Sequence, residues 1–148
     1  MKKYLFILII FILATGFLVT LPQSRLTPES IRYVIIGGQR VKVDLAISKE
    51  AQAKGLGGRT GLPEGEGMLF VFDIPGKRRF WMEGMKFPID IIWITDNMQV
   101  VHIDRNAAPE SYPKTFGPDA YVKYVLEVPA GFSDKNNLKL GNRIQFSD

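Results

Sequence analysis

Short apolar segments, separated by turns rich in glycine and proline, dominate the sequence from residue 31 onward. Residues 41–47, "VKVDLAI", place four aliphatic side chains on one side of an extended chain and Lys42 and Asp44 on the other. This period of two is typical of a half-buried strand. Further strands are predicted by the apolar character of residues 31–36, 68–72, 80–82, 90–95, 99–104, 120–128 and 142–146.

One segment predicts a soluble helix. Residues 48–55 begin with Ser48, a suitable N-cap, and end with Gly55, which terminates helices well. The βαβ alternation of a parallel sheet is not evident. The chain is therefore expected to be mainly β (α+β), a single small domain of seven to eight short, mostly antiparallel strands. These would form a partly closed barrel or sandwich with one short helix.

The first 21 residues have a different character. Two lysines precede an uncharged apolar run of 18 residues, from Tyr4 to Leu21. Such a segment is an export signal with cleavage after Gly16, or a signal anchor that spans the bilayer as a helix. We favour the retained anchor, and in both cases the domain is exported. Residues 1–21 are thus a signal peptide or anchor, residues 22–30 a polar tether, and residues 31–148 the β-rich domain.

Composition excludes several classes of function. The chain has no cysteine, which rules out a lipoprotein anchor, disulfides and a cysteine nucleophile. From Ser30 onward it carries 16 basic and 14 acidic residues, a net charge of +2, so we expect no nucleic-acid partner. His102 is the single histidine and cannot complete a zinc site alone. No phosphate-binding glycine motif is present, and we expect neither a metal nor another cofactor.

Carboxylates beside apolar strands are the remaining candidates for chemistry: Glu66, Glu83, Asp90 and Glu127. A buried carboxyl group can have a raised pKa and serve as an acid or base, and two that face each other could hydrolyse a glycoside. The alternative is that each binds backbone amides or an arginine. We expect Arg59, in a glycine-rich loop, to pair with Asp90 or Glu127 in an ion pair that is at least half buried.

Three segments together carry a resemblance: "AISKEAQAKGLGGRTGLPEGEGMLFVF", "FWMEGMKFPIDIIWITDNMQVVHI" and "YVLEVPAGFSDKNNLKLGNRIQF". Over about residues 40–147 the chain resembles the family domain of unknown function 192. That family is widespread in bacteria and archaea, often follows a signal peptide and has no established activity. The residues that match its pattern are Gly55, Leu56, Arg59, Gly67, Met68, Phe70, Phe72, Trp81, Met82, Pro88, Asp90, Leu126, Glu127 and Gly131.

Two places depart from the family pattern. Gly57 replaces a methionine, and Glu83-Gly84-Met85 replaces Lys-Asn-Thr after the Trp-Met pair. If that Asn-Thr pair contacts a ligand in the family, this chain has exchanged it for an acid. The departures weaken the expectation of a catalytic mechanism shared with the family.

The leading hypothesis is an exported, membrane-tethered domain that binds a small polar or sugar-like ligand, or an envelope partner. The ligand-binding residues would be Arg59, Trp81, Glu83, Asp90 and Glu127. The first alternative is a carboxylate-dependent hydrolase, whose catalytic residues the sequence does not assign. The second is a structural or assembly module, which would have a flat apolar patch and no pocket. The membrane would be a partner only through an uncleaved N-terminal helix, and the oligomeric state stays open.

Overall fold

The computed structural model describes residues 27–148. The expected signal peptide or anchor and most of the expected tether lie outside the described residues. Among residues 27–148, none of the helices has the length and apolar character needed to cross a membrane. The strands in this part are β1 (Tyr33–Ile36), β2 (Gln39–Ala46), β3 (Glu66–Gly76), β4 (Phe80–Trp81), β5 (Ile89–Ile94), β6 (Val100–Ala107), β7 (Thr115–Phe116), β8 (Val122–Pro129) and β9 (Gln145–Ser147). The helical elements are α2 (Lys49–Lys54), α3 (Phe132–Lys135) and two 3₁₀ turns, η1 (Pro28–Ser30) and η2 (Pro109–Ser111).

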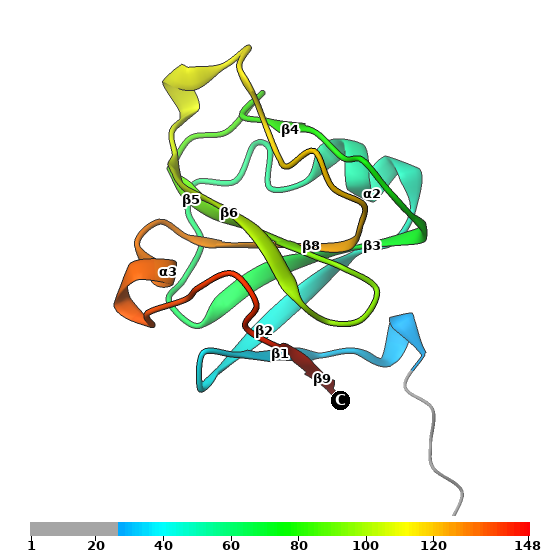
Figure 1. Ribbon diagram of the computed structural model, residues 1–148. Coiled ribbons are helices and arrows are strands. Elements are labelled where there is room, and N and C mark those ends of the chain that lie inside the picture. Colours follow the sequence, from blue (N-terminus) through cyan, green and yellow to red (C-terminus); the bar gives the residue numbers. More distant parts are fainter. Residues whose placement is uncertain (1–26) are drawn as a thin grey trace, which may run out of the picture.

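Seven of these strands form one sheet in the order β6-β5-β8-β3-β2-β1-β9, and β4 and β7 form a separate pair. The larger sheet is strongly curled (Figure 1). The neighbouring strands are antiparallel except for β2 and β3, which are parallel. The prediction of a mainly β, mostly antiparallel domain is confirmed. Three details were wrong: residues 27–148 contain nine strands instead of seven to eight, α2 connects the parallel strands as one βαβ unit, and a second short helix, α3, is present.

Hydrogen bonds near the two edges of the sheet curl it into a half-barrel. The Val100 N–H at the start of β6 donates to the Asn142 carbonyl at 2.9 Å, and the Gly141 N–H donates to the Val100 carbonyl at 2.8 Å. Gln99 and Arg143 form an isolated bridge beside them. The segment that leads into β9, one edge strand, therefore lies against the beginning of β6, the other edge strand.

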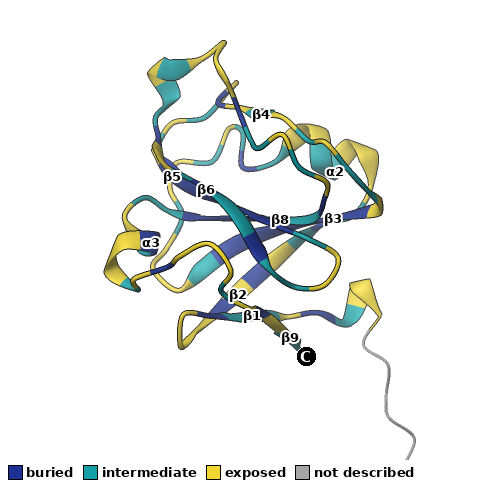
Figure 2. Cartoon of the chain, in the orientation of Figure 1, coloured by how far each residue is buried: buried dark blue, intermediate teal, exposed yellow. Residues whose placement is uncertain are grey.

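The sheet is covered on both faces, so β5 is entirely buried and β8 is mostly buried (Figure 2). One face packs Val34, Leu69, Ile92 and Leu126 into a first core. The other face packs Phe70, Ile91, Trp93 and Val125 into a second core, which α2, the loop after it and the chain around β4 cover. Full burial of each aliphatic or aromatic side chain contributes about 1.5–3 kcal/mol. Strand β5, "IDIIWI", contacts both cores, which explains why its sequence is apolar at every position but one.

The helix predicted from residues 48–55 is confirmed as α2. The Ser48 hydroxyl accepts a hydrogen bond from the Ala51 N–H at 3.1 Å, and Gly55 ends the helix with a φ of 48°. The side chain of Gln52 fastens the helix to the sheet. Its Nε2 atom donates to three main-chain carbonyls, those of Ala46, Ile47 and Val71, at 3.2, 3.2 and 2.9 Å. These contacts fix the position of α2 beside the second core.

Candidate functional site

A pocket of about 400 Å³ lies where α2 and the chain around β4 meet the second face of the sheet. Its charged and aromatic lining residues come from four elements or their flanks: Lys54, Phe70, Arg79, Phe80, Trp81, Glu83 and Glu127. Three of them, Trp81, Glu83 and Glu127, were predicted as ligand-binding residues from the sequence. The pocket is therefore the candidate functional site.

Glu127 is the buried acid of this pocket. It lies in β8 opposite Met68 of β3 and Ile91 of β5, so apolar side chains flank it in both neighbouring strands. Only 6% of the residue is exposed, and its Oε2 atom is buried without a hydrogen-bond partner among residues 27–148. Burial raises the pKa of Glu127 to about 8, while the positive charge of Arg59 lowers it in part. At neutral pH the protonated carboxylic acid therefore predominates.

Trp81 belongs to the exposed rim of the pocket. The residue is 54% exposed, and its ring contacts Tyr112 edge to face with the centroids 5.9 Å apart. The neighbouring Met82 is only 2% exposed and anchors this segment in the second core. Of the two tryptophans, Trp81 therefore lies at the surface, whereas Trp93 is fully buried.

Arg79, Phe80, Trp81 and Glu83 all line the pocket from β4 and the residues that flank it. Met82, between the last two, is buried in the second core. Sequence reasoning singled out neither Arg79 nor Lys54, which ends α2. The basic residues directly before the aromatic pair Phe80-Trp81 are the signal that could have found Arg79.

The two departures from the family pattern lie side by side. The Gly58 N–H donates to the Gly84 carbonyl at 2.9 Å, which joins the loop after α2 to the turn after β4. A Cβ atom at Gly57 would lie 2.9 Å from the Lys54 carbonyl and 3.6 Å from the Glu83 carbonyl. Gly84 has a φ of 70°, a conformation that glycine adopts without strain. The two changes therefore shape the same wall of the site.

Arg59 binds Asp44, which corrects the expectation that it would pair with Asp90 or Glu127. The Nη2 to Oδ2 distance is 2.9 Å, and the side chains are 39% and 61% exposed. Arg59 lines an adjoining hollow of about 390 Å³ beside Met68, outside the lining of the main pocket. An exposed partner leaves the guanidinium partly hydrated, which avoids the desolvation penalty that a buried pair would incur.

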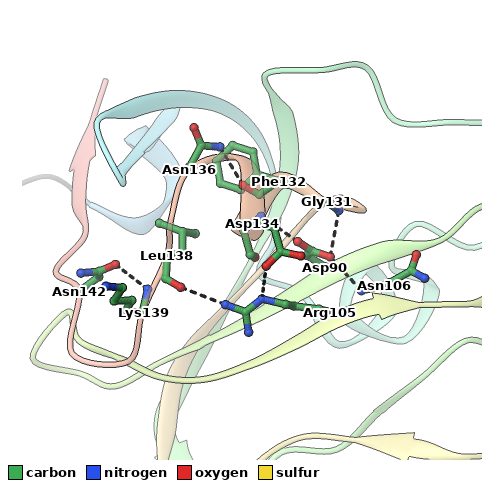
Figure 3. A network of polar contacts seen from close by, with 11 residues as sticks. Asp90, Arg105, Asn106, Gly131, Phe132, Asp134, Asn136, Leu138, Lys139 and Asn142 are labelled. Atoms are coloured by element: carbon green, nitrogen blue, oxygen red, sulfur yellow. Dashed lines mark hydrogen bonds and ion pairs between the residues drawn. The ribbon is translucent and has the colours of Figure 1, made fainter.

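Asp90 is a structural residue away from the pocket. It is fully buried at the start of β5, and its carboxylate accepts three backbone hydrogen bonds (Figure 3). Oδ1 accepts from the N–H groups of Asn106 and Gly131 at 2.9 and 3.2 Å, and Oδ2 accepts from the Ser133 N–H at 2.8 Å. The alternative interpretation, in which a strand acid binds loop amides, therefore holds for Asp90.

The remaining candidates also have local partners. Glu66 forms an ion pair with Lys42 at 3.7 Å. His102 contacts the carboxylate of Asp104 at 3.2 Å, and that carboxylate also accepts the Trp93 indole N–H at 2.8 Å. Within residues 27–148, no three His, Asp or Glu side chains are grouped so as to share a metal ion.

Comparison with known proteins gives a family but no activity. The profile of DUF192, described as "Uncharacterized ACR", matches residues 32–146. A protein of unknown function from Novosphingobium aromaticivorans DSM 12444 has a similar structure, with a TM-score of 0.74 and 30% identity over 84% of this chain and 89% of that one. A candidate transcription regulator from Sinorhizobium meliloti 1021 gives a TM-score of 0.72 and 26% identity over 77% of this chain and 90% of that one. No curated protein matches significantly. The chain belongs to the DUF192 family.

Proposed function

We propose that this chain is an exported, membrane-tethered domain whose pocket binds a small polar or sugar-like ligand, free or carried by an envelope partner. The observation that carries the proposal is the buried carboxyl group of Glu127, which lines the pocket and has no hydrogen-bond partner at Oε2 among the described residues. Buried polar atoms are almost always hydrogen-bonded, and an exception calls for an explanation. A ligand group in the pocket would supply the partner.

The rim supports a sugar-like ligand in particular. Trp81 presents a large aromatic surface to solvent beside polar and charged groups, although a side chain of this kind would ordinarily be buried. An aromatic ring beside hydrogen-bonding groups is suited to a ligand that has both an apolar face and polar edges. The size of the pocket falls within the usual range for small-molecule sites.

The proposal of export and membrane tethering is based on the first 21 residues, in which two lysines precede 18 uncharged apolar residues. Residues 27–148 carry 16 basic and 15 acidic residues, a net charge of +1. This balance gives no support for a nucleic-acid partner, even though one structural neighbour is described as a candidate transcription regulator.

Tryptophan fluorescence tests the proposal directly. Trp81 is exposed at the rim and Trp93 is fully buried, so a ligand in the pocket should shift the Trp81 emission. Cell-wall fragments and simple sugars would be titrated into the full chain, with Trp81→Phe as the variant that loses the signal. Absence of both a fluorescence change and a rise in melting temperature across the panel would contradict the proposal.

A carboxylate-dependent hydrolase is the second candidate, because Glu83 and Glu127 line the same pocket. A protonated buried acid and an exposed carboxylate are the two groups that glycoside hydrolysis requires. Glu66 and Asp90 are no longer candidates for this pair, since they bind Lys42 and backbone amides. Release of nitrophenol from nitrophenyl glycosides, lost in both Glu83→Gln and Glu127→Gln, would favour the enzyme. Binding without turnover would favour the binding domain.

A further inference from the structure

We propose that the ligand of this pocket is an acidic sugar or a sugar-like acid. Its anionic group would lie between Lys54 and Arg79, and a neutral hydroxyl or amide group would hydrogen-bond to Glu127. This inference rests on the proposed function and adds the sign of the ligand's charge and its orientation. The ligand's anionic group would face the rim and its neutral group the sheet.

Two cations in the pocket lining lack an acidic partner. Within residues 27–148, neither Lys54 nor Arg79 forms a salt bridge, and Arg79 donates instead to the main-chain carbonyl of Gly117. Both side chains are exposed and line the pocket. Glu83 is the one exposed acid in the same lining, so the rim has an excess of positive charge. Such a rim attracts anions, and an arginine can bind a carboxylate in a bidentate manner.

The inner part of the pocket requires a neutral group. Glu127 lies between the apolar side chains of Met68 and Ile91. A carboxylic acid in this position can donate one hydrogen bond and accept others, as a hydroxyl or amide partner requires. An ammonium group would be repelled by the two rim cations and would lose much of its hydration beside the buried Glu127. The two parts of the pocket therefore select against amines.

The charged groups around Glu127 come from α2, the loop after it and the segment around β4: Lys54, Arg59, Arg79 and Glu83. Of these, Arg59 also binds Asp44. Strands β3 and β5 contribute only apolar side chains beside Glu127. When Glu127 ionises at high pH, its carboxylate loses the donor that a ligand hydroxyl or carbonyl accepts from, and it repels a ligand acid. Binding of an acidic sugar should therefore weaken as pH rises from 7 to 9.

Titration calorimetry on the full chain with three matched probes tests the inference: D-glucuronate, D-glucose and D-glucosamine. D-Glucuronate is expected to bind at least about tenfold more tightly than D-glucose, because one charge-assisted contact is worth that much. D-Glucosamine should bind most weakly of the three. Lys54→Ala and Arg79→Ala should each reduce D-glucuronate affinity to near that of D-glucose. Lys49→Ala, an exposed lysine of the same helix outside the pocket lining, should leave it unchanged.

The outcomes separate the inference from the proposed function. Equal or tighter binding of D-glucose or D-glucosamine would overturn the acidic-sugar assignment and leave a polar-ligand pocket in place. Binding of D-glucuronate that Lys54→Ala and Arg79→Ala do not weaken would also overturn it. Absence of binding for all three probes, and for the wider panel of cell-wall fragments, would overturn both. Glu127→Gln keeps a neutral group at this position, so its D-glucuronate affinity should stay constant between pH 7 and 9; a parallel loss of affinity in this variant would exclude Glu127 as the contact.

Discussion

Arg59 holds Asp44 at 2.9 Å on the surface, while its positive charge lowers the pKa of the buried Glu127 without contacting that residue. The ion pair lies at the edge of the hollow that adjoins the main pocket, where both side chains keep much of their hydration. Arg59 thus forms an ion pair with Asp44 at the surface, and its charge also lowers the pKa of Glu127 in the candidate site.

Arg59→Ala is expected to change the free energy of unfolding by less than about 1 kcal/mol, because exposed ion pairs contribute little. It should also raise the pKa of Glu127 further, since a positive charge that lowers this pKa is removed. Urea unfolding and carboxyl carbon NMR titration of Glu127 measure the two effects. Asp44→Ala is the matched control, because it breaks the same pair and leaves the arginine charge in place. A loss of about 3 kcal/mol would mean that Arg59 binds a buried acid after all.

Asp90→Asn should destabilise the domain by about 2–4 kcal/mol. The carboxylate accepts the N–H groups of Asn106, Gly131 and Ser133, and an amide would turn a donor toward at least one of them. Amide hydrogen exchange should accelerate at Gly131 and Ser133, where the chain enters α3. Asp134→Asn is the control, since this exposed acid binds only Arg105 in the same region (Figure 3). Equal stability of the two variants would show that Asp90 does not fasten α3.

Local sequence patterns were enough to predict the fold class. They could not predict which strands pair when those strands are far apart in the sequence. The alternation in residues 41–47 and the cap at Ser48 were enough to place β2 and α2. The parallel pairing of β2 with β3 was missed, because it depends on how α2 and a glycine-rich loop return the chain to the sheet.

In the candidate site, too, local patterns identified residues but did not predict their long-range contacts. Glu83 and Glu127 were selected because they stand beside apolar strands and Trp81 because it matches the family pattern, and all three line the pocket. The predicted partner of Arg59 was wrong, because Asp44 has the pattern of an ordinary solvent-facing residue in a half-buried strand. Nothing in the local pattern indicates that the loop after α2 returns past that residue.

Gly67→Ala should destabilise the domain by about 1–3 kcal/mol, the usual cost of overpacking. A Cβ atom at Gly67 would lie 2.7 Å from the Glu127 carbonyl oxygen, so strands β3 and β8 would have to separate. Gly61→Ala is the control, because nothing lies within 4 Å of its Cβ position. Thermal unfolding of both variants measures the difference. Equal melting temperatures would show that the two strands can move apart freely beside the pocket.

The last prediction concerns the pH dependence of stability that Glu127 causes. Its pKa rises from an ordinary value of 4.5 to about 8 in the folded chain. Between these two values the folded state holds a proton that the unfolded state has released, so the free energy of unfolding must fall as pH rises through this window. Below pH 4.5 both states are protonated, and above pH 8 both are ionised, so this contribution is constant outside the window.

Glu127→Gln replaces the carboxyl group with a neutral group of similar shape and should remove this dependence. The variant should match the wild type near pH 4.5 and exceed its free energy of unfolding by about 3–5 kcal/mol near pH 8.5, at about 1.4 kcal/mol for each unit of pKa shift. Urea unfolding at several pH values measures the difference. Glu83→Gln, in the same pocket but exposed, is the control and should keep the wild-type dependence. If the difference between Glu127→Gln and the wild type were constant from pH 4.5 to 8.5, Glu127 would be ionised across that range, and the pocket would present an anion to its ligand instead of a neutral acid.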